Sequence, residues 1–134
     1  MKHIQPGDQL PGYDHPTDTR QQFLYNAALW NAHRIHFDLP YATEVEGYPG
    51  LVVAGPLMGE WLTQCVNDWL GDNGTMVSFE YSNRRAAIVG DVLHAGGKVV
   101  SVDPDTGTVK LELQVSNDAG EAVTLGAAEV RFSD

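Results

Sequence analysis

The chain has 134 residues, the length of one domain that can bury a hydrophobic core without disulfides. Its formal net charge of −10, from 18 acidic and 8 basic side chains, disfavours nucleic acid and anionic membrane surfaces as partners. That charge does not exclude an anionic small ligand, which needs only a few local donors. Hydrophobic residues make up 43% of the chain, more than a disordered protein has.

The single cysteine, Cys65, cannot form a disulfide within the chain, so we expect a reducing compartment. The first residues have no apolar run of the kind found in secretory signals. No segment approaches the roughly 20 apolar residues that span a bilayer. We therefore expect a soluble, cytoplasmic protein whose residues 1–134 form a single domain.

The first part of the chain predicts a short edge strand and a helix. Prolines in residues 7–16 allow at best a short strand at a sheet edge. Thr17 or Asp18 can cap a helix over residues 19–30, in which apolar side chains follow helical spacing and the polar ones fall mainly on the other side. The apolar positions are Phe23, Leu24, Ala27, Ala28 and Leu29, and the polar ones are Arg20, Gln21, Gln22 and Asn26. Asn31 follows at the C-terminal end.

A second, short helix is expected after Asp38, which can cap it, with Gly47 as its stop. Residues 48–50 form a turn signal, and residues 51–53 a short buried run. Residues 57–70 predict the main helix, since their apolar side chains cover an arc of roughly 220°. An arc that wide indicates burial on several sides.

The remainder of the chain alternates as strands do. Strands are predicted over residues 75–82, 88–102, 108–115 and the last segment to Phe132. Gly96 and Gly97 predict a bulge or bend, and a change of apolar parity around Gly126 predicts another bulge. Helices followed by antiparallel strands indicate an α+β fold in which the sheet wraps around the main helix.

Two segments carry a family resemblance: NAHRIHFDLPYA, starting at Asn31, and EGYPGLVVAGPL, starting at Glu46. They resemble the MaoC-like hydratase/dehydratase family of hot-dog folds, and most closely its mesaconyl-CoA (3-methylfumaryl-CoA) hydratase-like subset. The resemblance implies a long central helix wrapped by an antiparallel sheet, a dimer with paired sheets, and (R)-specific hydration of enoyl thioesters in fatty acid metabolism. It also implies a substrate carried by CoA or acyl-carrier protein, and neither a metal nor another cofactor.

The family motif maps onto particular residues of this chain. His36 matches its catalytic histidine, and Asn31 stands where most members have an acid, although the mesaconyl-type subset is similar in having Asn there. Ala54 replaces a histidine found in many members, and Gly55 matches the glycine whose N–H is expected to hold the thioester carbonyl. We expect His36 to transfer protons, Asn31 to position water, and Gly55 to bind the developing oxyanion.

Other readings of the same features remain open. The chain is alternatively a hot-dog subunit that binds acyl thioesters without catalysis, or that completes the site of a different hot-dog partner in a heteromer. An acyl-CoA thioesterase is a further alternative, which Asn31 in the acid position disfavours.

Several individual side chains also have two interpretations. Arg84 and Arg85 bind a CoA phosphate or occupy a surface turn, and Trp61 packs in the core or lines an acyl tunnel. The histidines at positions 15, 33 and 36 match no zinc spacing. Cys65 lies within the apolar arc and is expected to pack.

Overall fold

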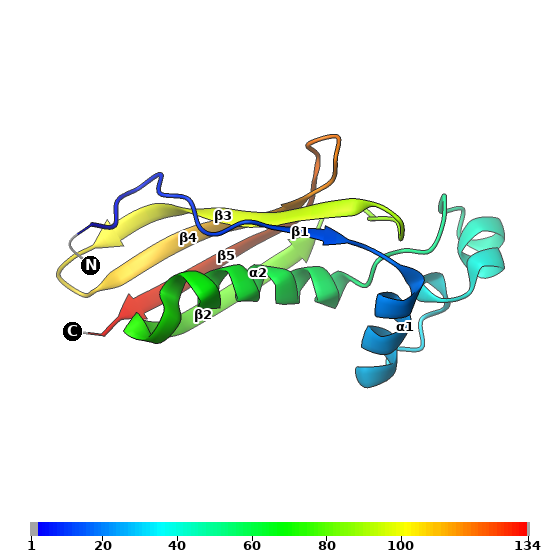
Figure 1. Cartoon of the computed structure of the whole chain (residues 1–134), viewed down its shortest axis with the longest axis horizontal. Coiled ribbons are helices and arrows are strands. Elements are labelled where there is room, and N and C mark those ends of the chain that lie inside the picture. Colours follow the sequence, from blue (N-terminus) through cyan, green and yellow to red (C-terminus); the bar gives the residue numbers. More distant parts are fainter. Residues whose placement is uncertain (1–2, 134) are drawn as a thin grey trace.

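The computed structural model describes residues 3–133 and contains a five-stranded antiparallel sheet in the order β1-β3-β4-β5-β2 (Figure 1). The strands are β1 (Tyr13–Pro16), β2 (Gly74–Asn83), β3 (Val92–Asp103), β4 (Thr108–Ser116) and β5 (Ala122–Phe132). The helices are α1 (Thr19–Ala28) and α2 (Gly55–Leu70), with the short turns η1 (Arg34–His36), η2 (Tyr41–Val45) and η3 (Gly71–Asn73). Across residues 3–133, no helix has the length and apolar composition needed to cross a membrane.

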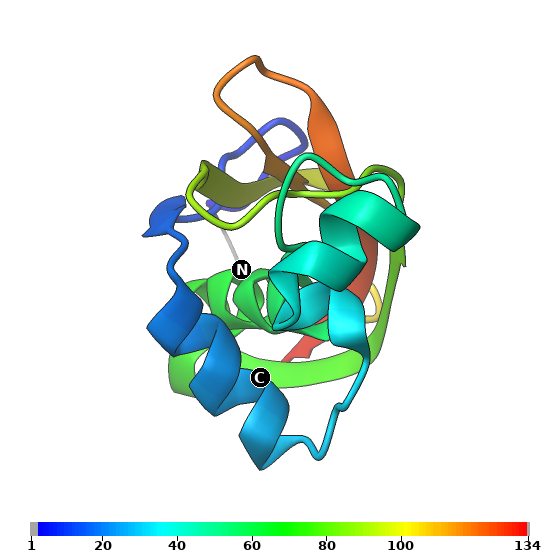
Figure 2. The same cartoon turned by 90° about the vertical axis from the view of Figure 1, so that its right-hand side faces the viewer.

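Helix α2 lies along the concave face of the sheet, which curls around it (Figures 1 and 2). Its buried side chains point in several directions, as the wide apolar arc predicted: Leu57, Met58, Trp61, Leu62, Cys65, Val66 and Leu70. Trp61 stacks on His15 with 4.1 Å between ring centroids, and Cys65 is fully buried. The predicted α+β hot-dog arrangement is therefore confirmed.

Strands β3, β4 and β5 form a meander of antiparallel strands as predicted, whereas β2 pairs with β5 and not with β3. The irregularities of the strands also differ from those predicted. Gly96 and Gly97 pair in register with β4, and the shift in β3 falls between Val99 and Ser101 instead. Gly97 is needed because an added Cβ would overlap the carbonyl oxygen of Glu112. A side chain there would collide with the neighbouring strand, which explains the glycine without a bulge.

The parity change in β5 occurs earlier than predicted. Val123 and Thr124 are both buried, whereas Leu125 is exposed, because the pairing of β4 and β5 shifts register next to Ser116. Gly126 lies in register, and a Cβ there would come within 2.9 Å of Leu62 Cδ1 on α2. This glycine allows close contact between helix and sheet and does not form the predicted bulge.

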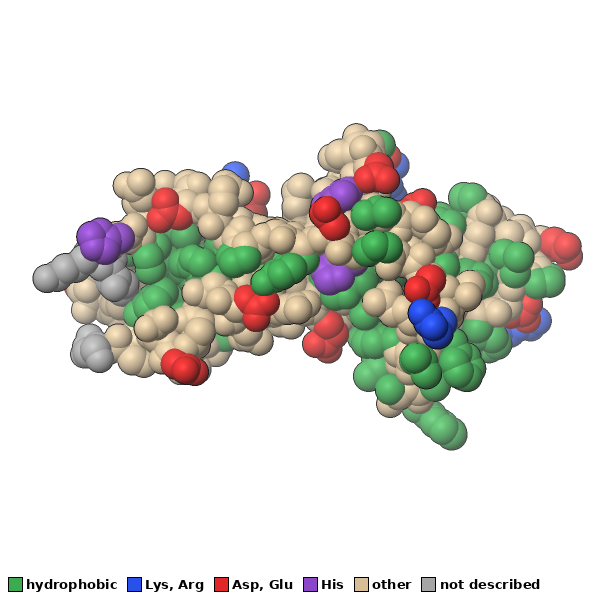
Figure 3. Space-filling model, in the orientation of Figure 1, with side chains coloured by type: hydrophobic (Ala, Val, Ile, Leu, Met, Phe, Trp, Pro, Cys, Tyr) green, Lys and Arg blue, Asp and Glu red, His purple; other side chains and the backbone are tan. Residues whose placement is uncertain are grey.

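Helix α1 begins as predicted, since the Asp18 side chain accepts from the Gln21 N–H at 2.7 Å. The helix faces the protein with its polar side, because Gln22 and Asn26 are the residues it buries. Its apolar side chains gather on the surface at the end of the molecule to which α1 belongs (Figure 3). The exposed large ones are Phe23 and Leu24 on α1, and Leu29 and Trp30 directly after it. The usual inference from helical spacing, that the apolar side faces the core, is wrong here.

A second, smaller hydrophobic cluster supports the segment between the two long helices. It contains Ile35, Ala42 and Val52, with partly buried neighbours that include Tyr48 and Ile88. The Val52 N–H donates to the Ile35 carbonyl at 3.0 Å, so η1 is fastened directly to the segment that enters α2. Asp38 accepts from the Tyr41 N–H as the predicted cap, and Gly47 ends this region with a φ of 76°.

We expect the stability of the sheet edge to depend on the pH through His94. Its Nδ1 donates to Asp14 on β1 at 2.6 Å and its Nε2 to Asp118 at 2.7 Å, and these carboxylates raise the pKa of the imidazole above 6.5. The contribution is complete below pH 6.5 and is lost as the pH rises through the raised pKa. Urea unfolding at pH 6 and pH 9 tests this: the wild type should lose more stability over that interval than His94→Gln, and equal losses would contradict it.

Candidate active site

His36 lies at the end of η1 and is only 7% exposed. The ring approaches the main chain that enters α2, since Nδ1 is 2.7 Å from the Val52 carbonyl oxygen. A carbonyl oxygen only accepts, so Nδ1 carries the proton and donates. In the neutral ring the lone pair is therefore on Nε2, which is the atom able to take a proton.

The environment keeps the His36 ring neutral. Burial is the largest influence and lowers the pKa of His36 below its usual 6.5, while the hydrogen bond to Val52 opposes this. The nearby ring of His33, with 5.6 Å between centroids, lowers the pKa further. A neutral imidazole with a free Nε2 is the form required of a general base at physiological pH.

Gln22 joins the segment around His36 to the start of α2. Its Nε2 donates to the carbonyl oxygens of His36, at 3.3 Å, and Val52, while its Oε1 accepts from the Ala54 N–H at 3.1 Å. The side chain is 3% exposed. One amide therefore satisfies three buried main-chain groups and fixes His36 relative to the helix start.

Gly55 is the first residue of α2, which has no side-chain cap. The neighbouring N–H groups are already used or missing: that of Ala54 donates to Gln22, Pro56 has none, and that of Leu57 donates to the Ala54 carbonyl at 3.1 Å. The Gly55 N–H therefore remains as the donor of this first turn that a ligand can use. His36 bonds Val52, three residues before Gly55, and Gln22 bonds both Val52 and Ala54 in the segment between them.

Asn31 lies after the end of α1, which stops at Ala28, earlier than predicted, and Trp30 takes a left-handed φ of 57°. The Asn31 N–H donates to the Asn26 carbonyl at 2.8 Å, and its Oδ1 accepts from the His33 N–H at 3.1 Å. These bonds leave Nδ2 for a ligand. The side chain is half-buried and reaches η1 through its bond to His33, but among residues 3–133 no hydrogen bond joins it directly to His36.

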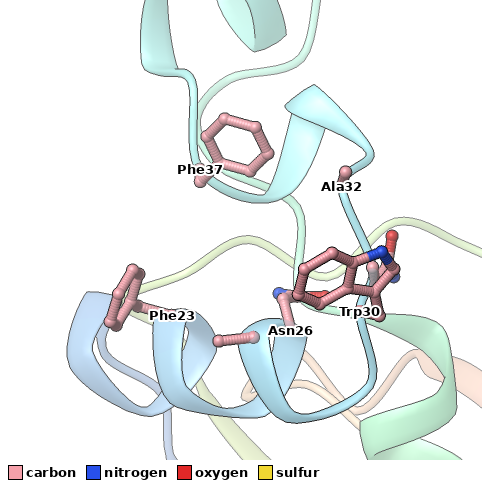
Figure 4. A pocket seen from close by; sticks show the side chains of 7 residues that line it. Phe23, Asn26, Trp30, Ala32 and Phe37 are labelled. Atoms are coloured by element: carbon pink, nitrogen blue, oxygen red, sulfur yellow. The ribbon is translucent and has the colours of Figure 1, made fainter.

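An apolar pocket of about 370 Å³ opens beside Asn31 (Figure 4). Phe23 and Trp30 come from α1 and the turn after it, and Phe37 faces them from the residue that follows His36. Asn26 lies on α1 between Phe23 and Trp30. The pocket places an apolar surface next to one of the predicted site residues.

Other candidate residues lie elsewhere. His15 packs on Trp61 in the core, away from the His33 and His36 pair. Trp61 itself is 5% exposed, which favours its interpretation as a core residue. Arg85 forms an ion pair with Glu121 at 2.8 Å, a surface contact.

Comparison with known proteins agrees with this architecture. The family model of hydroxyacyl-thioester dehydratase type 2 matches residues 11–89, more than half of the chain. The chain belongs to this family. The match contains Gln22, Asn31, His36 and Gly55, so every residue of the site described above lies within the part shared with hydroxyacyl-thioester dehydratases type 2.

Among curated proteins, this dehydratase-family chain is similar to mesaconyl-C(4)-CoA hydratase of Chloroflexus aurantiacus. The two are 55% identical over 47 residues, which are 35% of this chain and 17% of that protein. The matched part is thus a small share of a longer relative. The predicted likeness to mesaconyl-CoA hydratases is confirmed.

Solved structures confirm the hot-dog fold. An (R)-hydratase from A. caviae superposes with a TM-score of 0.89 over 99% of this chain and 100% of the other, at 16% identity. A MaoC-like dehydratase has the same TM-score at 26% identity, over 98% of this chain and 42% of the other. The ChsH1–ChsH2 complex of Mycobacterium tuberculosis matches with a TM-score of 0.84 and 17% identity over 96% of this chain and 98% of that chain. Hot-dog neighbours of this fold thus include a heteromeric complex.

Proposed function

We propose that this protein adds water to an enoyl thioester, or removes it from a 3-hydroxyacyl thioester, with CoA or acyl-carrier protein as the carrier. His36 transfers the proton, Asn31 positions the water, and the Gly55 N–H holds the thioester oxygen. The support is the shared family, together with a buried neutral imidazole fastened to the same short segment as an uncapped helix start.

The proposed reaction balances with these residues alone. Water oxygen attacks the β-carbon while Nε2 of His36 takes one water proton, and the electron pair of the carbon–carbon double bond moves to the thioester oxygen as an enolate. The Gly55 N–H and the helix dipole stabilise that charge. The imidazolium then returns the proton to the α-carbon, which yields the 3-hydroxyacyl thioester and the neutral ring.

The single observation that carries this proposal is the hydrogen bond from His36 Nδ1 to the Val52 carbonyl. This hydrogen bond fixes the tautomer so that Nε2 is the base. It also holds the ring at Val52, two residues before Ala54, which is the N-cap of α2. A histidine held only for packing needs neither a free Nε2 nor proximity to an uncapped helix N-terminus.

The direct test is an ultraviolet assay of the purified protein with crotonyl-CoA, a four-carbon enoyl thioester, and with its eight-carbon homologue. Hydration removes the absorbance of the conjugated thioester. Steady loss of that absorbance by the protein alone supports the proposal. No loss with either thioester, by the protein alone or with a second hot-dog polypeptide, would contradict it.

The protein is proposed to act as a homodimer, because strand β2 lies at an open sheet edge and carries the exposed apolar side chains of Val77 and Tyr81. The heteromeric alternative is supported by the ChsH1–ChsH2 complex, a heteromer in which one chain has a fold similar to that of this protein. Analytical ultracentrifugation of the purified chain distinguishes them. A dimer with hydratase activity favours the homodimer, whereas activity only after addition of a different hot-dog subunit favours the heteromer.

For Asn31, we expect Asn31→Ala to lower kcat for crotonyl-CoA about tenfold, since one hydrogen bond to the attacking water is worth roughly 1.4 kcal/mol. The free Nδ2 is the group lost, because Oδ1 already accepts from His33. Asn67→Ala, on the exposed side of α2, is the matched control and should keep the wild-type rate. An unchanged kcat in Asn31→Ala would show that this side chain does not position water.

A further inference from the structure

The proposed oxyanion site has one main-chain donor where two are usual. Three of the four N–H positions from Ala54 to Leu57 are occupied or absent, as described above, and only Gly55 is free. Ala54 contributes no side-chain donor. Enzymes that stabilise an enolate or a tetrahedral oxyanion aim several preorganised donors at the oxygen. The first turn of α2 by itself is therefore an incomplete site.

Asn83 supplies a candidate for the second donor. It is the last residue of β2, opposite Thr124 on β5. Its side chain lies directly against Gly55: a Cβ added to that glycine would overlap Asn83 Nδ2 and lie 3.0 Å from its Cγ. The glycine thus leaves space that the Asn83 amide fills.

The orientation of this amide is fixed by a buried neighbour. Thr124, which is fully buried, donates from Oγ1 to Asn83 Oδ1 at 2.9 Å. The carbonyl side of the amide is therefore turned to the sheet, and the Nδ2 donors face the start of α2. No hydrogen bond among residues 3–133 uses Nδ2, and Asn83 is exposed, so a ligand can reach it.

We propose that the Asn83 side-chain amide is a second donor to the thioester oxygen, next to the Gly55 N–H. This inference deepens the proposed function and depends on it. Asn83 contacts the substrate in this role, and the Thr124 hydroxyl acts through it as a positioning group. Two donors of independent origin, one from a helix start and one from a strand end, then converge on the oxygen that becomes negative.

The experiment compares Asn83→Ala and Asn83→Asp with the wild type, with Ser82→Ala on the same strand as the matched control. The Asp variant retains the acceptor for Thr124 and the side-chain size, so it preserves a structural role but removes the Nδ2 donors. Two readouts are used: kcat with crotonyl-CoA, and the infrared carbonyl stretch of bound butyryl-CoA labelled with ¹³C at the thioester carbon. Butyryl-CoA has no double bond to hydrate, so the second readout is independent of turnover.

We expect both Asn83 variants to lose about 10²–10³-fold in kcat, with a smaller change in KM, as for removal of one oxyanion donor. The carbonyl stretch, displaced to lower wavenumber in the wild type, should move back toward that of free butyryl-CoA in both variants and remain displaced in Ser82→Ala. A stretch that is equal in wild type and both variants overturns the proposal, as does a wild-type complex with no displacement. A displaced stretch that depends on Asn83 in a protein without hydratase activity supports the donor and contradicts only the proposed reaction.

Discussion

Replacement of His36 by alanine should abolish most of the proposed hydratase activity, with kcat for crotonyl-CoA reduced by about 10²–10⁴, the range typical of a lost general acid–base residue. Nε2 is the free nitrogen of a ring whose Nδ1 donates to Val52, and no other described histidine has this environment. His94→Gln is the matched control, because His94 lies between two carboxylates at the sheet edge. It should keep the wild-type kcat.

The pH profile provides an independent check of the same role. Burial lowers the pKa of His36 below 6.5, so the ring is the neutral base at neutral pH and becomes protonated only in more acidic solution. We expect kcat/KM for hydration to be constant around pH 7 and to fall on the acid side, with a midpoint below 6.5. A midpoint above 6.5, or a His36→Ala variant that retains the wild-type rate, would exclude His36 as the base.

The sequence predicted the fold because its strongest patterns are set by burial. The apolar arc of residues 57–70 and the alternation of Val109, Leu111, Leu113 and Val115 both report which side chains the core accepts. Both predictions are confirmed. Glycines were less informative, since Gly97 and Gly126 are explained by close approach of a neighbouring strand or helix. A sequence alone does not distinguish that role from a bulge.

The polar side of α1 could not be predicted from its spacing. Helical periodicity indicates which residues share one side of a helix, and hydrophobicity usually indicates which side faces the core. Gln22 reverses that assignment because buried main-chain groups near the start of α2 need partners, and its side-chain amide supplies them. Asn26, one turn later, donates from Nδ2 to the Gln22 carbonyl within α1. The one sequence signal was a pair of uncharged amides four residues apart, which by itself does not identify the groups they bind.

His36, Asn31 and Gly55 were predicted through the family resemblance, whereas Gln22 and Asn83 were not predicted as site residues. Both residues lie outside the two motif segments. Their roles depend on contacts between residues that are at least 30 positions apart in the sequence: Gln22 with Val52, and Asn83 with Thr124. Such contacts follow from the packing of the elements. They become visible only once α1, α2 and the sheet have been placed.

The largest effect on stability is expected for Gln22→Leu. The substitution leaves the His36 carbonyl and the Ala54 N–H without their buried partner, and it leaves His36 Nδ1 as the remaining donor to the Val52 carbonyl. A buried unsatisfied group costs about 1–3 kcal/mol, so the free energy of unfolding should fall by at least about 2 kcal/mol. Urea unfolding measures this. Gln21→Leu, one residue away with a half-buried side chain, should change it by less than about 1 kcal/mol.

The variant Gln22→Glu separates the contribution of the Gln22 hydrogen bonds to stability from that of side-chain packing, because Glu has the same size as Gln. An ionised carboxylate accepts from Ala54 but faces two carbonyl oxygens, so burial and repulsion raise the pKa of the introduced carboxyl above its unfolded value of about 4.3. Stability relative to the wild type is then greatest below that value and is lost as the pH rises through the folded pKa. Because a protonated carboxyl donates again, unfolding at pH 5 should show a smaller deficit than at pH 8. Equal deficits at both pH values would mean that Gln22 fills space and does not hold His36 to the helix start.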